Sequence, residues 1–168
     1  MSLWVRIIAV TTLLAFTACG FSPLYGEHEN APAATAALDR IYIENIPERE
    51  GQYLRNALID RFYNSGRPAQ PAFTLSIQPL QETRTDLDIT KSSDATRAQL
   101  RLNTTMSLLD RGTGRELLRR KLTSITSYNI LQSQFTTRVS EQNTRQNALD
   151  DLARQIELQL ALYFKRGD

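Results

Sequence analysis

The fold is decided by residues 97–130, whose sequence is RAQLRLNTTMSLLDRGTGRELLRRKLTSITSYNI. In the first half of this stretch, apolar side chains share alternate positions: Ala98, Leu100, Leu102, Met106 and Leu108. Polar side chains occupy the positions between them. Successive side chains of a β-strand point to opposite faces of a sheet, so the pattern predicts a strand with one buried face and one exposed face.

The middle of the stretch predicts a turn, and its second half predicts a returning strand. Residues 110–114, DRGTG, combine aspartate and two glycines, which favour tight turns. Apolar positions resume at Leu118 and Leu122. Residues 97–130 are therefore predicted to form a long β-hairpin. A phosphate-binding loop would need a helix after the glycines, and a strand is expected there instead.

Periodicity predicts three further elements before the hairpin. Residues 40–44 alternate and indicate a short strand. Between residues 50 and 63, leucine or phenylalanine recurs every fourth position, which is typical of one face of a helix. Residues 73–77 alternate as a strand, which Leu87 and Ile89 extend after an irregularity at Pro79.

A C-terminal helix completes the predicted fold. Its apolar stripe consists of Leu149, Leu152, Ala153, Ile156, Leu160 and Tyr163. This stripe is expected to cover the buried face of the hairpin. The predicted fold class is α/β (α+β), a two-layer sandwich. About four strands form a mostly antiparallel or mixed sheet covered by two helices, in the order β-α-β-β-β-α.

The N-terminus has the layout of a signal peptide. Residues 1–6 carry a positive charge, residues 7–16 are almost wholly apolar, and small residues follow up to Gly20. A membrane-spanning helix needs about 20 apolar residues, and this run is shorter. The predicted domains are therefore a signal peptide over residues 1–18, a lipidated N-terminus and tether over 19–37, and a periplasmic domain over 38–168.

Cys19 is the predicted lipidation site. Its place directly after small residues resembles the lipobox of bacterial lipoproteins, in which this thiol is acylated and becomes the new N-terminus. The lipobox prefers leucine where this chain has Phe16. Gly20 follows Cys19, rather than the aspartate that resembles an inner-membrane retention signal, so outer-membrane sorting is expected. The alternative is an ordinary secretory signal with an uninvolved cysteine.

Composition and residue counts argue against several functions. The chain has 20 basic and 18 acidic residues, too even a balance for a nucleic-acid-binding surface. It has one cysteine and one histidine, so the usual nucleophilic triads and metal clusters lack their side chains. The pairs Asp86 with Asp88 and Asp150 with Asp151 are interpreted as solvated surface acids rather than catalytic pairs. No enzyme activity, cofactor or metal is predicted.

Residues 123–147 are unusually rich in uncharged polar side chains. Of these 25 residues, 16 are Ser, Thr, Asn or Gln. Such side chains suit a surface buried against another polar wall, where an unpaired charge would cost several kcal/mol. The alternative is a polar hairpin end followed by a loop.

A basic group surrounds the predicted hairpin turn. Its members are Arg111, Arg115, Arg119, Arg120 and Lys121. Guanidinium groups match phosphate geometry, so a phosphorylated glycolipid is a candidate ligand for a protein held at the outer membrane. The alternative is a solvated face of the hairpin.

The chain resembles the lipopolysaccharide-assembly lipoprotein family LptE, particularly its alphaproteobacterial forms. The resemblance rests on Cys19-Gly-Phe-Ser-Pro-Leu-Tyr25 and on the order and length of the elements that follow. It implies a non-catalytic plug and partner of the LptD outer-membrane β-barrel, which assists barrel assembly and lipopolysaccharide delivery to the outer membrane. Two alternatives are an auxiliary lipoprotein of a lipid or ABC-type transport system and a lipid-anchored hydrolase.

Overall fold

The computed structural model describes residues 36–63, 66–89, 95–131 and 133–166. The predicted signal peptide and residues 19–35 of the predicted lipidated N-terminus and tether, including Cys19, lie outside the described residues. Residues 36–38 form a helical turn that precedes the sheet.

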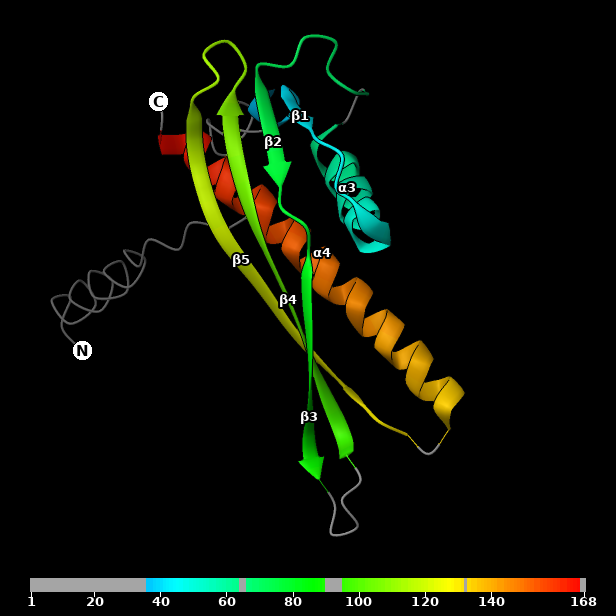
Figure 1. Ribbon diagram of the computed structural model, residues 1–168. Coiled ribbons are helices and arrows are strands. Elements are labelled where there is room, and N and C mark those ends of the chain that lie inside the picture. Colours follow the sequence, from blue (N-terminus) through cyan, green and yellow to red (C-terminus); the bar gives the residue numbers. More distant parts are fainter. Residues whose placement is uncertain (1–35, 64–65, 90–94, 132, 167–168) are drawn as a thin grey trace, which may run out of the picture. The chain divides into compact units, whose positions relative to one another are not determined.

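The other elements confirm the predicted α+β class (Figure 1). They are β1 (Ile41–Ile43), α3 (Glu48–Phe62), β2 (Phe73–Ile77), β3 (Gln81–Ile89), β4 (Ala95–Asp110), β5 (Glu116–Asn129) and α4 (Gln134–Arg166). The predicted hairpin is the β4–β5 pair. With the first helical turn, the order is α-β-α-β-β-β-β-α, because the strand expected to continue past Pro79 divides into β2 and β3.

The sheet is mixed and has five strands. β5 pairs with one edge of β4, while β2 and β3 pair one after the other with the opposite edge. β1 adds to β2 in parallel, and every other pairing is antiparallel.

The division between β2 and β3 is a β-bulge. Ile77 pairs with Met106 and Gln81 pairs with Asn103, so residues 78–80 face only two residues of β4. The Gln78 amide donates to the Thr105 carbonyl at 2.9 Å, and the Thr104 hydroxyl donates to the Gln78 carbonyl at 2.7 Å. Pro79, which has no N–H to donate, is accommodated at such an irregularity.

The bulge exchanges the two faces of the strand. On β2, Leu75 and Ile77 are buried in the core. On β3, Glu82 and Arg84 occupy that same face, because they pair with Leu102 and Leu100. Charged side chains therefore point toward the helices along β3, and neutral ones point away.

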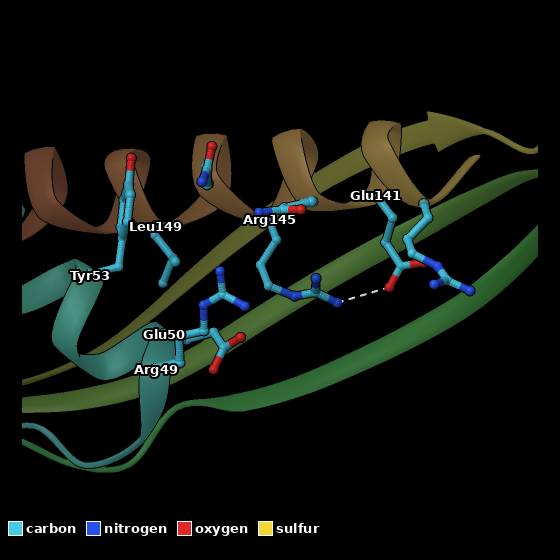
Figure 2. A pocket seen from close by; sticks show the side chains of 9 residues that line it. Arg49, Glu50, Tyr53, Glu141, Arg145 and Leu149 are labelled. Atoms are coloured by element: carbon cyan, nitrogen blue, oxygen red, sulfur yellow. Dashed lines mark hydrogen bonds and ion pairs between the residues drawn. The ribbon is translucent and has the colours of Figure 1, made fainter. Parts of the chain in front are cut away.

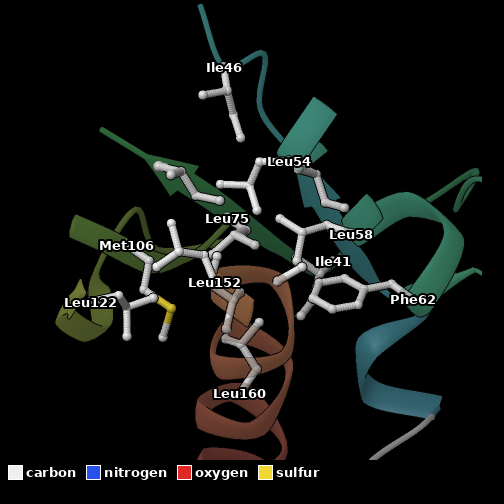
Figure 3. Packing of buried hydrophobic residues seen from close by; sticks show 14 of the residues in the cluster. Ile41, Ile46, Leu54, Leu58, Phe62, Leu75, Met106, Leu122, Leu152 and Leu160 are labelled. Carbon is white, nitrogen blue, oxygen red and sulfur yellow. The ribbon is translucent and has the colours of Figure 1, made fainter. Parts of the chain in front are cut away.

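The hydrophobic core lies between the sheet and both helices, which cover one face of the sheet (Figures 1 and 3). α3 contributes Leu54, Leu58 and Phe62 to it. α4 contributes a stripe that includes Leu152 and Leu160. This packing confirms the predicted two-layer arrangement.

α3 packs closely against the chain that enters it. A Cβ atom added to Gly51 would lie 2.6 Å from Ile46 Cγ2 and 3.0 Å from the Ile46 carbonyl oxygen. Ile46 is fully buried, so its side chain has no free space to move into. Position 51 therefore requires glycine, because the helix backbone lies too close to Ile46 for any side chain, although glycine is unfavourable inside a helix.

α4 is longer than the sequence pattern predicted. It begins at Gln134, and its buried positions begin only at Thr144. Its first half lies in the polar stretch, where no apolar stripe reveals the helix. Polar contacts with the sheet, described below, hold this half in place. No helix among the described residues is long and apolar enough to cross a membrane.

Candidate functional site

The side of β3, β4 and β5 that faces away from α3 and α4, here called the open face, is mainly polar. Most of its side chains carry hydroxyl or amide groups: Gln81, Thr83, Thr85, Gln99, Asn103, Thr105, Ser107, Thr123, Ser127 and Asn129. The predicted alternation of buried and exposed side chains along β4 is confirmed. No helix in the described ranges covers this face.

The charges on the open face are unbalanced. Arg97, Arg101 and Lys121 lie on it, and none of them forms an ion pair with a described residue. Glu116 is the only acid on this face within the described parts of β3–β5, and its carboxylate binds Arg119 at 2.6 Å. The hydrogen bond from Arg119 holds the pKa of Glu116 below its ordinary value. The face is therefore polar and locally cationic.

The bulge leaves a shallow pocket on the open face, here called the bulge pocket. Its volume is about 280 Å³, and Lys121 is the only charged residue that lines it. The other polar side chains of its wall include Gln78, Gln81, Asn103 and Thr123. Thr123 donates its hydroxyl to the Asn103 side-chain oxygen at 2.8 Å. The pocket thus combines one ammonium group with several amides and hydroxyls.

The predicted basic group is divided by the alternation of β5. Arg119 and Lys121 lie on the open face, and Arg120 lies on the opposite face, opposite Met106. Arg111 stacks over the Tyr42 ring, with 5.6 Å between the guanidinium carbon and the ring centre. The five side chains therefore do not converge on a single site.

The hairpin turn between them is tightly ordered. Asp110 accepts hydrogen bonds from the Thr113 amide at 2.7 Å and from its hydroxyl at 2.8 Å. These hydrogen bonds lower the pKa of the Asp110 carboxyl. Gly114 has a φ of 69°, which favours glycine, so the predicted turn role of this residue is confirmed.

Part of the polar stretch over residues 123–147 is used inside the domain. On β5, Ser124 donates to Asp151 at 2.9 Å, and on α4 Gln155 donates to the Thr123 carbonyl at 3.2 Å. The Tyr128 hydroxyl donates to Glu141 at 3.1 Å. These bonds join strand to helix, so only the side chains on the open face and on the outer surface of α4 remain available to a partner.

An ionic network, here called the α4 clasp, joins the first half of α4 to β3. Figure 2 shows the part of this network that lies within α4, between Arg145 and Glu141. Arg145 donates two hydrogen bonds to Glu82, both at 2.7 Å, and one to Glu141 at 2.9 Å. These hydrogen bonds raise the pKa of Arg145, and the interaction with Glu82 has the largest effect. Arg145 and Glu141 also line a cleft of about 160 Å³ against the start of α3, with Tyr53 on the α3 side.

The carboxylate pairs have structural roles where they are described. Asp150 accepts a hydrogen bond from Tyr53 at 3.4 Å, and Asp151 is bonded to Ser124. Burial raises the pKa of Asp151, but the hydrogen bonds from Ser124 and Gln155 and the charge of Arg154 outweigh it and lower the pKa. Asp86 binds Arg84 at 3.0 Å, and the side chain of Asp88 lies outside the described residues. Among the described residues, no cluster of three or more ligating side chains could hold a metal ion.

Comparisons with known proteins agree with the fold. A family model described as LptE, lipopolysaccharide-assembly, matches residues 38–160. A Caulobacter crescentus CB15 protein assigned as a lipoprotein superposes with a TM-score of 0.63 at 20% identity, over 80% of this chain and 97% of that one. Rare lipoprotein B from Shewanella oneidensis gives a TM-score of 0.56 at 13% identity, over 72% and 91%.

A minor lipoprotein from Acinetobacter baumannii has a TM-score of 0.53 at 23% identity, over 73% of this chain and 88% of that one. At these identities the likeness concerns the fold. No curated protein sequence matches the chain significantly.

These findings define a class of protein, a two-layer α+β domain with an open, polar sheet face. The family match covers most of the chain and all of the sheet. The chain belongs to the LptE family, so its function lies in lipopolysaccharide assembly. The family is non-catalytic, which confirms the prediction that the chain is not an enzyme.

Proposed function

We propose that this protein is a lipid-anchored component of the outer membrane that plugs and assists an LptD-type β-barrel. In this role it takes part in assembling the barrel and delivering lipopolysaccharide to the outer leaflet. The open face is the observation that carries the proposal, because hydroxyl and amide side chains without a covering helix suit contact with a polar barrel lumen. The family match supports the same role.

The anchor in this proposal is Cys19, which follows the small residues of the signal peptide. Acyl chains contribute about 0.8 kcal/mol for each buried methylene, so several chains on one residue hold a domain at a membrane without a spanning helix. The domain then reaches the barrel from the inner surface of the outer membrane.

We assign contact with lipopolysaccharide phosphates to the turn end of the β4–β5 hairpin, here called the hairpin end. Arg111, Arg115 and Arg120 are exposed there, and none of them forms an ion pair with a described residue. Arg119 is less suited to an anion because Glu116 already neutralises it. Arginine forks bind phosphate through paired, charge-assisted hydrogen bonds.

The partnership is tested by co-purification. The full-length protein with a C-terminal tag is expressed in a Gram-negative host with its cognate LptD-type barrel, and the outer membrane is solubilised gently. We expect the barrel in a stoichiometric amount. Cys19→Ala should lose the acyl mass and leave the outer-membrane fraction. Recovery of the tagged protein alone, or with inner-membrane transporter subunits, would contradict the proposal.

The lipid contact is tested by replacing Arg111, Arg115 and Arg120 with serine in the full-length protein. We expect its affinity for purified lipopolysaccharide to fall about tenfold or more, since hydrogen bonds to charged groups contribute about 1.5–3 kcal/mol each. The control replaces three exposed helix arginines, Arg49, Arg138 and Arg154, and thereby removes the same charge elsewhere. Equal affinity of the two variants would rule out the hairpin end.

A further inference from the structure

The two faces of the sheet differ in how their charges are neutralised. On the helix side, Arg145 is paired with Glu82 and Glu141, and Arg84 with Asp86. On the open face, Arg101 and Lys121 have no acidic partner among the described residues. The bulge contributes to this segregation, because it turns the acids of β3 toward the helices.

The bulge pocket adds a specific position to this cationic face. Lys121 is the only charged residue of its wall, and Thr123 and Gln81 bring a hydroxyl and an amide beside it. The Thr123 hydroxyl already donates to Asn103, so the ammonium group of Lys121 and the Gln81 amide are the donors that match a single carboxylate here.

We propose that the open face docks against an acidic, hydrogen-bonding patch on the inner wall of the barrel, with one wall carboxylate seated in the bulge pocket beside Lys121. This inference rests on the proposed function and adds to it the contact face and the charge of the partner. Arg101 faces the same patch from the neighbouring part of β4. Charge complementarity of this kind sets the register of an interface and excludes wrong partners.

The surface favours a protein wall over a lipid as the occupant of the open face. An anionic lipid brings acyl chains, which need an apolar groove. Of the exposed large apolar side chains among the described residues, only Ile125 lies on the open face of β3–β5. Regular rows of hydroxyl and amide groups instead match the polar, strand-built inner wall of a barrel.

The test reverses the charge of two of the three unpaired cations on the described part of the open face. Arg101→Glu and Lys121→Glu are combined in the tagged full-length protein, which is then co-purified with the barrel. Because both side chains are exposed, the fold should be retained, and circular dichroism checks this. We expect at least about tenfold less barrel per tagged protein, since like charges across an interface cost several kcal/mol. The matched control, Arg49→Glu with Arg138→Glu, reverses two exposed helix arginines that form no ion pair with a described residue, and it should retain the barrel.

The outcomes separate this inference from the proposed function. If the unaltered protein recovers no barrel, the proposed function fails. If the unaltered protein and the open-face variant recover equal amounts, the plug role stands and the docking face is wrong. A photocrosslinking residue at position 123 identifies the occupant directly. A crosslink to the barrel supports the inference, and a crosslink to lipopolysaccharide overturns it.

Discussion

Replacing Leu152 with alanine is expected to lower the free energy of unfolding by about 2–5 kcal/mol. Leu152 is 0% exposed and lies in the middle of α4, where the cluster joins this helix to α3 and the sheet (Figure 3). Removing its branched end takes away buried apolar surface and leaves a cavity that the surrounding elements cannot fully close. Urea unfolding followed by circular dichroism measures the change.

The control for this prediction is Leu158→Ala on the same helix. Leu158 is 57% exposed, so its replacement should change the free energy of unfolding by no more than about 0.5 kcal/mol. Both changes have the same effect on helix propensity, and their difference therefore isolates burial. Equal losses from the two replacements would mean that α4 does not pack on the sheet as described.

Replacing Arg145 with methionine is expected to release the first half of α4 from β3 and to cost about 1–3 kcal/mol. Arg145 is 22% exposed and is shared between Glu82 and Glu141. Without the guanidinium, these two partly buried carboxylates face each other with no cation between them. Few apolar contacts secure this half of the helix, because its buried positions begin at Thr144.

Hydrogen exchange of the α4 amides measures this release. We expect faster exchange over residues 134–146 and unchanged exchange from Ile156 to Leu160, where the core holds the helix. Arg154→Met is the control, because Arg154 is 58% exposed and its ion pair with Asp151 should contribute about 1 kcal/mol or less. If Arg145→Met leaves exchange unaltered, the α4 clasp has no role in holding the helix.

Several elements could be predicted because their local pattern and their packing agree. β4 alternates from Arg97 to Leu108 because one of its faces is buried and the other is more exposed. The second half of α4 shows a helical stripe because that stripe packs on the sheet. The turn at residues 110–114 could be predicted because it depends on local features alone. The Asp110 side chain accepts a hydrogen bond from Thr113 within the turn, and Gly114 adopts the positive φ that the turn requires.

Other features could not be predicted because they depend on contacts between distant residues. The first half of α4 has polar side chains whose partners are on β3 and β5, such as Glu82 and Tyr128, more than ten residues away in sequence. The basic group looks continuous in the sequence, yet strand alternation places Arg120 and Lys121 on opposite faces. Residues that are neighbours in the sequence of a strand can therefore lie on opposite faces of the sheet.

The sequence by itself determined the class of fold, the hairpin and the family, because these depend on periodicity and on short local motifs. Only the tertiary structure decided which charges remain unpaired. The bulge at residues 78–80 shifts the register by one residue, and this shift turns Glu82 toward Arg145 and leaves Lys121 without an acid. A one-residue shift reverses every side chain of a strand. Pro79 marked the place of the irregularity in the sequence, but only the pairing of β2 and β3 with β4 shows that the irregularity adds one residue and so exchanges the two faces.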